Sequence, residues 1–329
     1  MAGENKKVLV AGGAGYIGSH VLKALSEAGF EPLVFDNLSS GHREAVLWGR
    51  LIKGDLADRK RLFELFEAER PLAVLHFAAF IVVPESVSHP LKYYENNLSG
   101  TLNLLQAACR FGVKAFIFSS SAAVYGIPSE VPIPETHPVS PINPYGASKA
   151  MVEQILSDCH QAYGLPFVSL RYFNAAGADP EARIGEAHHP ETHLIPLLLQ
   201  TALGKREKFF LYGTDYPTPD GTCIRDFIHV EDLARVHVLA LEHLLSGGES
   251  LVLNCGYGKG YSVKEVLEEA ERVCQRPIPY EIRERRPGDP PALVAGVEKM
   301  QKFFSFEPRF ADLSLILETA WRWEKARRF

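Results

Sequence analysis

A tyrosine and a lysine at helical spacing are the clearest candidates for chemistry in this chain. The motif YGASK at 145–149 lies at the start of a predicted helix, 144–163, where positions i and i+4 share one face. A free tyrosine has a pKa near ~10 and is a poor base at neutral pH, but a neighbouring ammonium can lower that pKa by roughly 1–3 units. We therefore expect Tyr145 to act as general base and then as general acid, with Lys149 favouring its phenolate.

Three serines supply a second set of polar groups. Ser119, Ser120 and Ser121 follow a predicted strand, 115–118, and so lie at the carboxyl edge of a sheet. Ligands of open α/β sheets bind at that edge, where Ser121 would bridge a substrate hydroxyl and Tyr145. A YxxxK motif alone is common as an exposed helical pair, so the catalytic interpretation depends on these serines and on a glycine-rich turn upstream.

The glycine-rich turn predicts a dinucleotide site. The sequence GGAGYIG at 12–18 follows an apolar strand, 6–11, and opens a helical stretch, 16–28. Gly12 permits the tight turn, Gly15 lets the backbone approach a pyrophosphate, and Gly18 lets helix and strand pack closely. The N–H groups at the start of the helix would face the phosphates. An isolated motif of this kind can be purely structural.

Acidic residues after the next two strands strengthen the prediction. Asp36 ends the strand 32–36, about 20 residues beyond the glycines, where a carboxylate accepts hydrogen bonds from the adenosine ribose. The same charge would repel a 2′-phosphate, which favours NAD, although Arg43 nearby keeps NADP open. Asp55 and Leu56 suit the adenine edge, or Asp55 is a helix N-cap; the sequence leaves both open.

The elements that must position these residues alternate along the first half of the chain. Further strands are expected at 50–53, 72–76 and 167–170, and further helices at 58–69 and 90–111. This alternation predicts an α/β fold, a Rossmann-type doubly wound parallel sheet covered on both faces. The periodicity fades after residue 172. We expect an NAD-binding domain at 1–172, with later returns near 226–255 that include a strand at 250–253. A smaller, interleaved α/β substrate-binding lobe would occupy 173–329.

Composition excludes several classes of partner. The chain has 329 residues, 46% of them hydrophobic, and a net charge of −5, which gives no electrostatic reason to expect nucleic acid or an anionic membrane. Neither a signal-peptide stretch nor a run long enough to cross a bilayer is expected. The 5 cysteines, at 109, 159, 223, 255 and 274, include no CxxC pair. A reducing, cytoplasmic setting is predicted.

Longer motifs carry a family resemblance. The segments concerned are GGAGYIGSH at 12–20, SSSAAVYG at 119–126, YGASK at 145–149 and RYFNAAG at 171–177. They resemble the extended short-chain dehydrogenase/reductase family. The segment 213–230, GTDYPTPDGTCIRDFIHV, and RPGD at 286–289 resemble the UDP-glucose (UDP-galactose) 4-epimerases specifically. The resemblance spans nearly the whole chain. It implies NAD as cofactor, a UDP-hexose inverted at C4 through a 4-keto sugar, and a homodimer.

The resemblance also implies roles for individual residues. Ser121, Tyr145 and Lys149 would be catalytic. The residues implied to contact NAD are Gly12, Gly15, Tyr16, Ile17, Gly18, Asp36, Asn37, Asp55, Leu56, Phe77, Ala78, Asn96, Ser119, Tyr145, Lys149 and Tyr172. Those implied to hold the UDP-sugar are Ser121, Tyr145, Asn174, His193, Leu194, Phe210, Arg225, Arg286, Asp289 and Leu293. Two arginines can neutralise a diphosphate through bidentate hydrogen bonds, although Arg286 taken alone would be a solvated loop charge.

Three positions depart from the family pattern. Ile81 stands where some members have a lysine near the cofactor phosphates, so NAD would be held less tightly. His193 replaces an asparagine that meets the substrate diphosphate, and either side chain can donate a hydrogen bond. Leu293 lies at the position that gates the sugar pocket. Tyrosine there accompanies hexoses and smaller residues accompany N-acetylated sugars, so UDP-N-acetylhexosamine and UDP-pentose remain alternatives.

Other reactions on this scaffold fit less well. Dehydratases of this fold have Asp-Glu after the active-site hydroxyl, where this chain has Ala122-Ala123. A non-catalytic NAD sensor would not need Ser121, Tyr145 and Lys149 together. A metal site at His188, His189, Glu191 and His193 is conceivable. Hydrogen bonding within the loop is favoured there, and no metal is expected.

The homodimer is expected through the helices 90–111 and 144–163. Leu98, Leu102 and Leu105 extend their apolar surface beyond one stripe, and packing on the chain's own sheet is the alternative.

Overall fold

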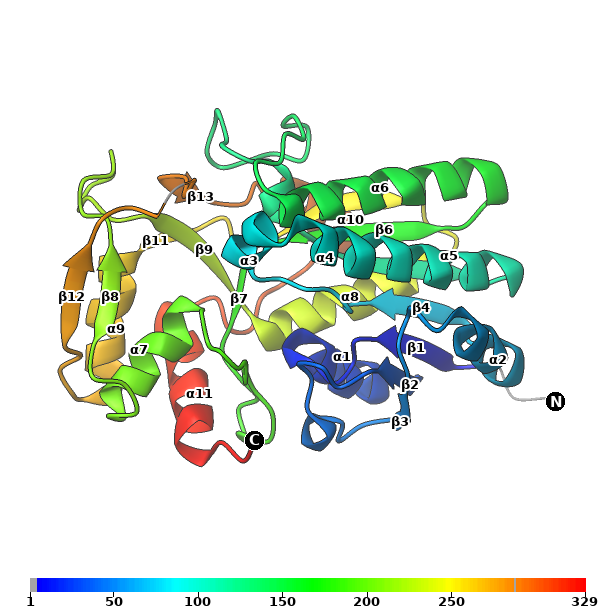
Figure 1. Cartoon of the computed structure of the whole chain (residues 1–329), viewed down its shortest axis with the longest axis horizontal. Helices are drawn as coiled ribbons and strands as arrows, with labels where there is room; N and C mark the ends of the chain where they lie inside the picture. Colours follow the sequence, from blue (N-terminus) through cyan, green and yellow to red (C-terminus); the bar gives the residue numbers. More distant parts are fainter. Residues whose placement is uncertain (1–4, 287) are drawn as a thin grey trace. The chain divides into compact units, whose positions relative to one another are not determined.

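A seven-stranded sheet forms the centre of the first half of the chain. The computed structural model describes residues 5–286 and 288–329. The strand order is β10-β6-β5-β4-β1-β2-β3 (Figure 1). The strands are β1 (Lys7–Ala11), β2 (Glu31–Asp36), β3 (Arg50–Lys53), β4 (Ala73–His76), β5 (Ala115–Ser121), β6 (Phe167–Tyr172) and β10 (Leu251–Cys255). The predicted Rossmann-type doubly wound sheet is confirmed, and the segment 250–253 joins it as expected.

The topology fixes where ligands of such a sheet bind. β1 pairs in parallel with both β2 and β4, so the chain runs outward through β3 and then returns to the other side of β1. This reversal of strand order is a switch point, and crevices open at the carboxyl ends of strands there. The glycine-rich turn directly follows the carboxyl end of β1.

Three helices share an apolar core with this sheet. They are α2 (Arg59–Glu69), α5 (Gly100–Arg110) and α6 (Pro144–Tyr163), and their buried side chains pack with those of β1, β2, β4 and β5. α5 and α6 run side by side (Figure 1). The remaining helices around the sheet are α1 (Tyr16–Glu27), α3 (Val83–Ser88), α4 (Pro90–Tyr94) and α8 (Val230–Leu245).

The boundaries of α6 follow from its sequence. The Asn143 side chain accepts a hydrogen bond from the Gly146 amide at 2.8 Å, and Pro144 occupies the first turn. Gly164, with φ of +69°, ends the helix in the left-handed region. The predicted range 144–163 is confirmed. The helix predicted at 90–111 is instead interrupted, because one π turn, Glu95–Ser99, separates α4 from α5.

The chain divides into two compact units, neither of them one continuous segment. The first contains residues 1–126, 138–171 and 234–253; the second contains 127–137, 172–233 and 254–329. The second unit has a small sheet of β7 (Asn174–Ala176), β9 (Ile224–His229), β11 (Gly260–Ser262) and β13 (Ala292–Leu293). β8 (Phe209–Tyr212) and β12 (Tyr280–Arg283) form a ribbon. The helices of the second unit are α7 (Leu194–Ala202), α9 (Val263–Cys274), α10 (Glu298–Phe304) and α11 (Leu313–Ala326).

A screen of the helices for membrane spans found none, within the described ranges, with the length and apolar character that crossing a bilayer requires.

Candidate functional site

The three glycines of the first turn are required for different reasons. Gly12 has φ of +81°, and a Cβ there would lie 2.5 Å from the Ala78 amide nitrogen. At Gly18 a Cβ would lie 2.4 Å from the Gly12 carbonyl oxygen. At Gly15, by contrast, a Cβ would lie no closer than 3.5 Å to that oxygen. The protein's own packing therefore requires glycine at 12 and 18, whereas the space at 15 fits the close approach of a pyrophosphate.

Asp36 is held in place by the turn that it faces. Its Oδ2 accepts the Ala14 amide at 3.0 Å, and its Oδ1 accepts the Leu38 amide at 2.8 Å. Burial raises the pKa of this carboxyl, and the two amide hydrogen bonds lower it. The carboxylate is thus fixed beside the glycine turn, with lone pairs left for a ribose diol.

Asp55 is not a helix N-cap. The N-cap of α2 is Asp58, whose side chain accepts the Arg61 amide. Asp55 instead accepts from Asn37 Nδ2 at 2.8 Å and from the Ala57 amide at 2.8 Å. Of the two interpretations left open by the sequence, the N-cap is wrong, and Asp55 is joined to the predicted cofactor residue Asn37.

Ser121, Tyr145 and Lys149 come together at the carboxyl end of β5. Ser121 is the last residue of β5, and its hydroxyl hydrogen-bonds to Tyr145. Lys149 Nζ donates to the Ser119 carbonyl oxygen at 2.8 Å and lies 5.8 Å from the centre of the Tyr145 ring. Gly146 lets the first turn of α6 approach β5, since a Cβ there would lie 2.5 Å from the Ala123 carbonyl oxygen. The geometry required of a serine–tyrosine–lysine catalytic group is present.

The pKa values of this pair differ from the sequence expectation. Burial raises the pKa of Tyr145, and the hydrogen bond with Ser121 lowers it. Burial lowers the pKa of Lys149 to about 7, while Glu153 raises it. The expected lowering of the Tyr145 pKa is therefore not a property of these side chains alone, because desolvation outweighs the hydrogen bond with Ser121.

A buried ion pair behind Lys149 was missed in the sequence. Glu153 accepts two hydrogen bonds from Arg171, at 2.9 and 2.6 Å, and one from the Ser120 hydroxyl at 2.5 Å. Arg171 also donates to Tyr125 Oη at 2.9 Å. The sequence feature that could have revealed Glu153 is its spacing, because it follows Lys149 by one helical turn and so lies on the same face of α6. The pair links α6 to β6 and fixes the helix face that carries Tyr145.

Other predicted cofactor residues surround the same edge of the sheet. Asn96 lies in the π turn and donates to Asn97 Oδ1, while Asn97 donates to the Ser148 hydroxyl on α6. Such turns are frequent at functional sites. Phe77 follows β4 and packs on His237 with ring centres 4.9 Å apart. Ile81, where a lysine was noted as missing, is 39% exposed.

In the second unit, β9 gathers one group of the predicted substrate residues. Arg225 and Leu293 are paired across β9 and β13, and Asn174 Nδ2 on β7 donates to the Asp226 carbonyl oxygen at 3.0 Å. The Arg225 guanidinium donates to the Pro290 carbonyl oxygen at 3.0 Å and lies 3.7 Å from Asp289 Oδ1. These contacts orient Arg225.

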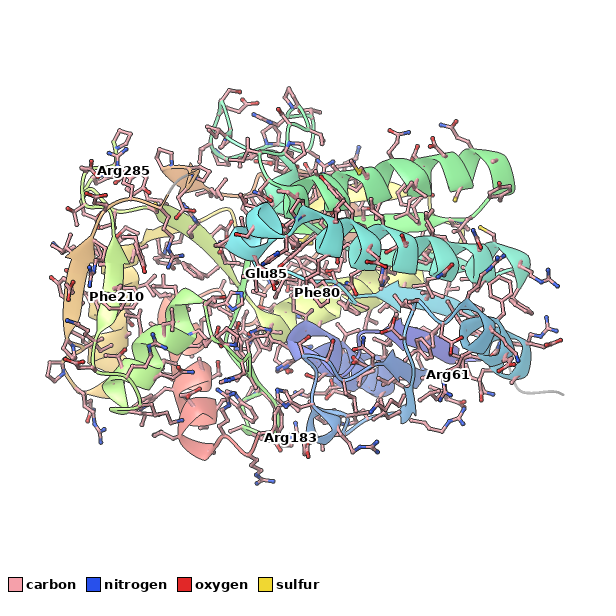
Figure 2. All side chains as sticks on the ribbon, viewed as in Figure 1. Arg61, Phe80, Glu85, Arg183, Phe210 and Arg285 are labelled. Atoms are coloured by element: carbon pink, nitrogen blue, oxygen red, sulfur yellow. The ribbon has the colours of Figure 1, made fainter. Side chains whose placement is uncertain are left out.

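The β8–β12 ribbon carries a second group. Phe210 lies on β8 (Figure 2), with the Arg283 guanidinium 4.9 Å from its ring centre. Arg286, beyond β12, packs over Tyr212 at 4.1 Å. Pro287 of the RPGD motif lies outside the described residues.

His193 is the N-cap residue of α7, and Leu194 is the first residue of that helix. His193 Nδ1 lies 2.8 Å from Glu186 Oε1 and 2.9 Å from Glu191 Oε1. Burial lowers the pKa of His193, but the two carboxylates raise it, to about 10. The pKa of Glu186 is raised by burial and lowered by His193 and His188, to about 2. The loop hydrogen bonding expected here is observed, with Glu186 as a member that the sequence did not reveal.

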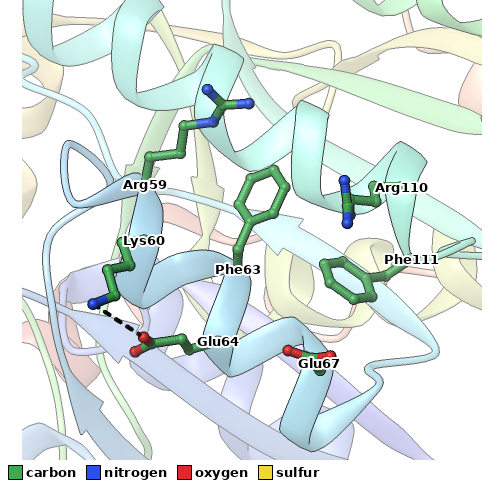
Figure 3. A pocket seen from close by; sticks show the side chains of 7 residues that line it. All are labelled: Arg59, Lys60, Phe63, Glu64, Glu67, Arg110 and Phe111. Carbon is green, nitrogen blue, oxygen red and sulfur yellow. Dashed lines mark ion pairs between the residues drawn. The ribbon is translucent and has the colours of Figure 1, made fainter.

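Not every surface hollow marks a functional site. Figure 3 shows one in the first unit, lined by Arg59, Lys60, Phe63, Glu64, Glu67, Arg110 and Phe111 of α2 and the end of α5. None of the predicted site residues lines it. Its rings and guanidinium groups contact one another, as Arg59 does with Phe63 at 5.2 Å. The candidate site is therefore defined by the side-chain geometry described above.

Comparison with known proteins agrees with this geometry. The family model described as "NAD dependent epimerase/dehydratase family" matches residues 8–256. A UDP-glucose 4-epimerase of Rhizobium meliloti (strain 1021) is 53% identical over 324 residues, which cover 98% of each chain. The solved UDP-glucose 4-epimerase of Brucella ovis in complex with NAD is 50% identical, covers 96% of this chain and 98% of its own, and superposes with a TM-score of 0.94. The UDP-Glc/GlcNAc 4-epimerase of Campylobacter jejuni is 44% identical, with coverage of 98% and 99% and a TM-score of 0.86.

Proposed function

Because this chain belongs to the NAD-dependent epimerase/dehydratase family, and within it to the UDP-glucose 4-epimerases, we propose that it interconverts UDP-glucose and UDP-galactose. The reaction inverts C4 of the hexose through a transient 4-keto sugar. The observation that carries this proposal is the meeting of Ser121, Tyr145 and Lys149 at the carboxyl end of β5. Ala122 and Ala123, the next residues, offer no acid or base for the elimination of water, so dehydration is not expected.

The first unit has the residues that NAD requires. Its pyrophosphate would approach the backbone at Gly15 and the start of α1, and Asp36 would accept from the adenosine ribose. The Asp36 carboxylate disfavours a 2′-phosphate, and Asn37 with Asp55 would meet the adenine end. Bound NAD would supply a reversible hydride acceptor for C4, and its positive ring would favour the phenolate of Tyr145.

Tyr145 carries the proton. Its phenolate oxygen takes the proton of the 4-hydroxyl, while the Ser121 hydroxyl holds that oxygen and the substrate oxygen in hydrogen-bond contact. The Lys149 ammonium stabilises the phenolate, and Glu153 supports the charged form of Lys149. Tyr145 then returns the proton to the 4-keto oxygen as the carbinol re-forms. No net oxidation occurs over the cycle.

The second unit would hold the nucleotide part of the substrate. Arg225 and Arg286 suit the diphosphate, and Asp289 suits the ribose hydroxyls. Phe210 and Leu194 offer apolar surface, and Asn174 and His193 offer hydrogen bonds. A substrate anchored mainly through UDP leaves the 4-keto sugar free to rotate. Such rotation is what delivery of hydride to either face requires.

We also propose that the chain forms a homodimer through α5 and α6. Leu102 on α5 and Met151 on α6 are 41% and 44% exposed, and Leu91 on α4 is 79% exposed. Leu105 is buried within the chain, so it packs on the protein's own core. Light scattering at micromolar concentration tests this proposal, and a monomer mass would refute it.

The experiment that tests the function is an assay without added cofactor. Purified protein is incubated with UDP-galactose, UDP-N-acetylglucosamine or UDP-xylose, and the nucleotide sugars are separated over time. UDP-glucose as the main product from UDP-galactose supports the proposal and shows that NAD remains bound. Turnover that begins only when NAD is added keeps the reaction and indicates weaker retention, as Ile81 predicts. Turnover of only the N-acetylated sugar or the pentose, or a 4-keto-6-deoxy product, contradicts the proposed substrate or reaction.

A further inference from the structure

Two glutamates and two histidines converge in the segment that precedes α7. They are Glu186, His188, Glu191 and His193, and one potential ligand atom from each lies within 4.8 Å of all the others. We propose that these residues form a binding site for a structural Zn²⁺ ion. The sequence suggested a different set, because it included His189 and did not include Glu186.

The spacing of the donor atoms fits tetrahedral zinc. Zn–N and Zn–O bonds of about 2.0–2.2 Å place neighbouring ligands of a tetrahedron about 3.4 Å apart. Here Glu186 Oε1 lies 3.1 Å from His188 Nδ1 and 2.8 Å from His193 Nδ1. Glu191 Oε1 lies 2.9 Å from His193 Nδ1, and Glu191 Oε2 lies 3.9 Å from His188 Nδ1. These separations lie on both sides of the tetrahedral edge, and every pair of ligand atoms in the cluster lies within 4.8 Å.

A buried carboxylate oxygen of Glu191 offers a lone pair to a cation. The side chain of Glu191 is only 4% exposed. Its Oε1 accepts the amides of Thr192 and His193, at 2.7 and 2.9 Å, which fixes the carboxylate. Its Oε2 has no hydrogen-bond partner among residues 5–286 and 288–329. A buried carboxylate oxygen left unsatisfied is costly, and a metal ion would satisfy it.

The charge and type of the ligands select the ion. Two carboxylates, with two imidazoles that release their protons when the ion binds, balance a divalent cation. Imidazole nitrogen suits zinc, whereas Mg²⁺ and Ca²⁺ prefer oxygen ligands throughout. Two cationic side chains in the neighbouring hollow, Lys205 and Arg327, pair with Glu324, at 2.8 and 3.8 Å. They do not replace the proposed ion.

Zinc would connect this segment to the candidate substrate site. Its ligands span 186–193, so the ion would fix the chain that leads into α7 and Leu194. Coordination through Nδ1 of His193 would place the remaining ring proton on Nε2, which makes that nitrogen a permanent donor. The role of Nε2 as a donor rests on the proposed function, because that function assigns His193 to the substrate diphosphate. Binding of the ion does not rest on the proposed function.

The test measures zinc itself. The whole chain is stripped with a chelator, titrated with Zn²⁺ or Mg²⁺, desalted and analysed for metal content and for thermal unfolding. We expect close to one zinc per chain, and a Tm that rises with Zn²⁺ but not with Mg²⁺. Because the histidines must lose their protons, zinc affinity should fall as the pH falls.

Variants locate the ion. His188→Ala and Glu191→Gln should each bind zinc at least tenfold more weakly, whereas the neighbouring His189→Ala, outside the cluster, should bind it as the parent does. Glu191→Gln keeps the side-chain volume, and circular dichroism checks that each variant is folded. No stoichiometric zinc in the parent chain, or equal binding by His188→Ala and Glu191→Gln, would overturn the site. UDP-galactose turnover is assayed separately, so failure of the zinc site and failure of the epimerase proposal are distinguishable.

Discussion

The end of β5 in the first unit and the surroundings of β9 in the second hold their functional side chains by different means. Ser121, Tyr145 and Lys149 lie on a central strand and a long, capped helix, and a buried ion pair supports them from behind. In the second unit, Arg225 is oriented by two carbonyl oxygens, and Arg286 extends from an exposed loop. The first region fixes its side chains on regular elements and through a buried ion pair, and the second relies on arginines near loops.

The difference matches what each region must do. Proton transfer needs atoms held within hydrogen-bond reach, so rigid elements are required. A diphosphate is large and charged, and it can be bound by flexible cations that order themselves on contact. Changes near β5 should therefore lower kcat, and changes near β9 should raise KM. The predictions below test that division.

The largest effect is expected from Tyr145→Phe. Loss of the phenolic oxygen removes the general base and acid, so kcat should fall by roughly 10²–10⁴-fold. KM and NAD content should change little. Tyr163→Phe, at the other end of α6 and 72% exposed, is the matched control and should keep parental kcat. A Tyr145→Phe enzyme with near-parental kcat would remove Tyr145 from the mechanism.

Lys149→Met should lower kcat by roughly 10²-fold and also change its pH dependence. The ammonium favours the tyrosine phenolate, so its loss should raise the pKa of Tyr145 and shift the rising limb of kcat to higher pH. In the parent chain the pKa of Lys149 is about 7 because of burial, so its charge is present below that pH and declines above it. The parent and Lys149→Met should therefore differ most at and below that pH. The measurement is kcat against pH, with Lys264→Met on α9 as control. An unshifted limb contradicts the electrostatic role.

Arg225→Met should act mainly on binding. Removal of one charge-assisted contact with the diphosphate should raise KM for UDP-galactose by roughly 10–100-fold and leave kcat within a few-fold of the parent. The inhibition constant of UDP should rise by a similar factor. Arg272→Met, an exposed arginine on α9, should alter neither. A fall in kcat without a change in KM would break the proposed division between the regions.

Leu293→Tyr should have the smallest effect, because it changes only the preference among sugars. The larger side chain on β13 should lower kcat/KM for the N-acetylated sugar several-fold relative to that for UDP-galactose. Competition assays with both sugars measure this ratio directly. An unchanged ratio would mean that position 293 does not contact the sugar.

Much of the first unit could be predicted from the sequence, because its elements are long, apolar and regularly spaced. The strands and the limits of α6 were found from periodicity and from the Asn-Pro and Gly signals at its ends. The π turn at Glu95–Ser99 was not found from the sequence, because one wider turn barely changes the spacing of the apolar residues. The raised pKa of Tyr145 was missed because desolvation depends on neighbours that the sequence does not reveal.

The second unit was predicted far less well. β7, β11 and β13 have two or three residues each, too few to show an alternating pattern. Their positions depend on pairing with β9, which is a contact distant in sequence. Likewise, Glu186 meets His193 because of the conformation of the loop between them, which the sequence does not reveal. Motif resemblance identified individual residues in this unit, whereas periodicity could not place them.

The open space beside Gly15 separates what folding demands from what function demands. Gly12 and Gly18 are enforced by atoms of the chain itself, whereas the nearest atom to a Cβ at 15 would lie 3.5 Å away, so under the proposed function only NAD restricts that position. A library selected solely for folding should therefore accept small side chains at 15 and reject them at 12 and 18. Selection for turnover should reject them at all three. Under the proposed function, binding of NAD therefore requires glycine at position 15, whereas stability alone does not.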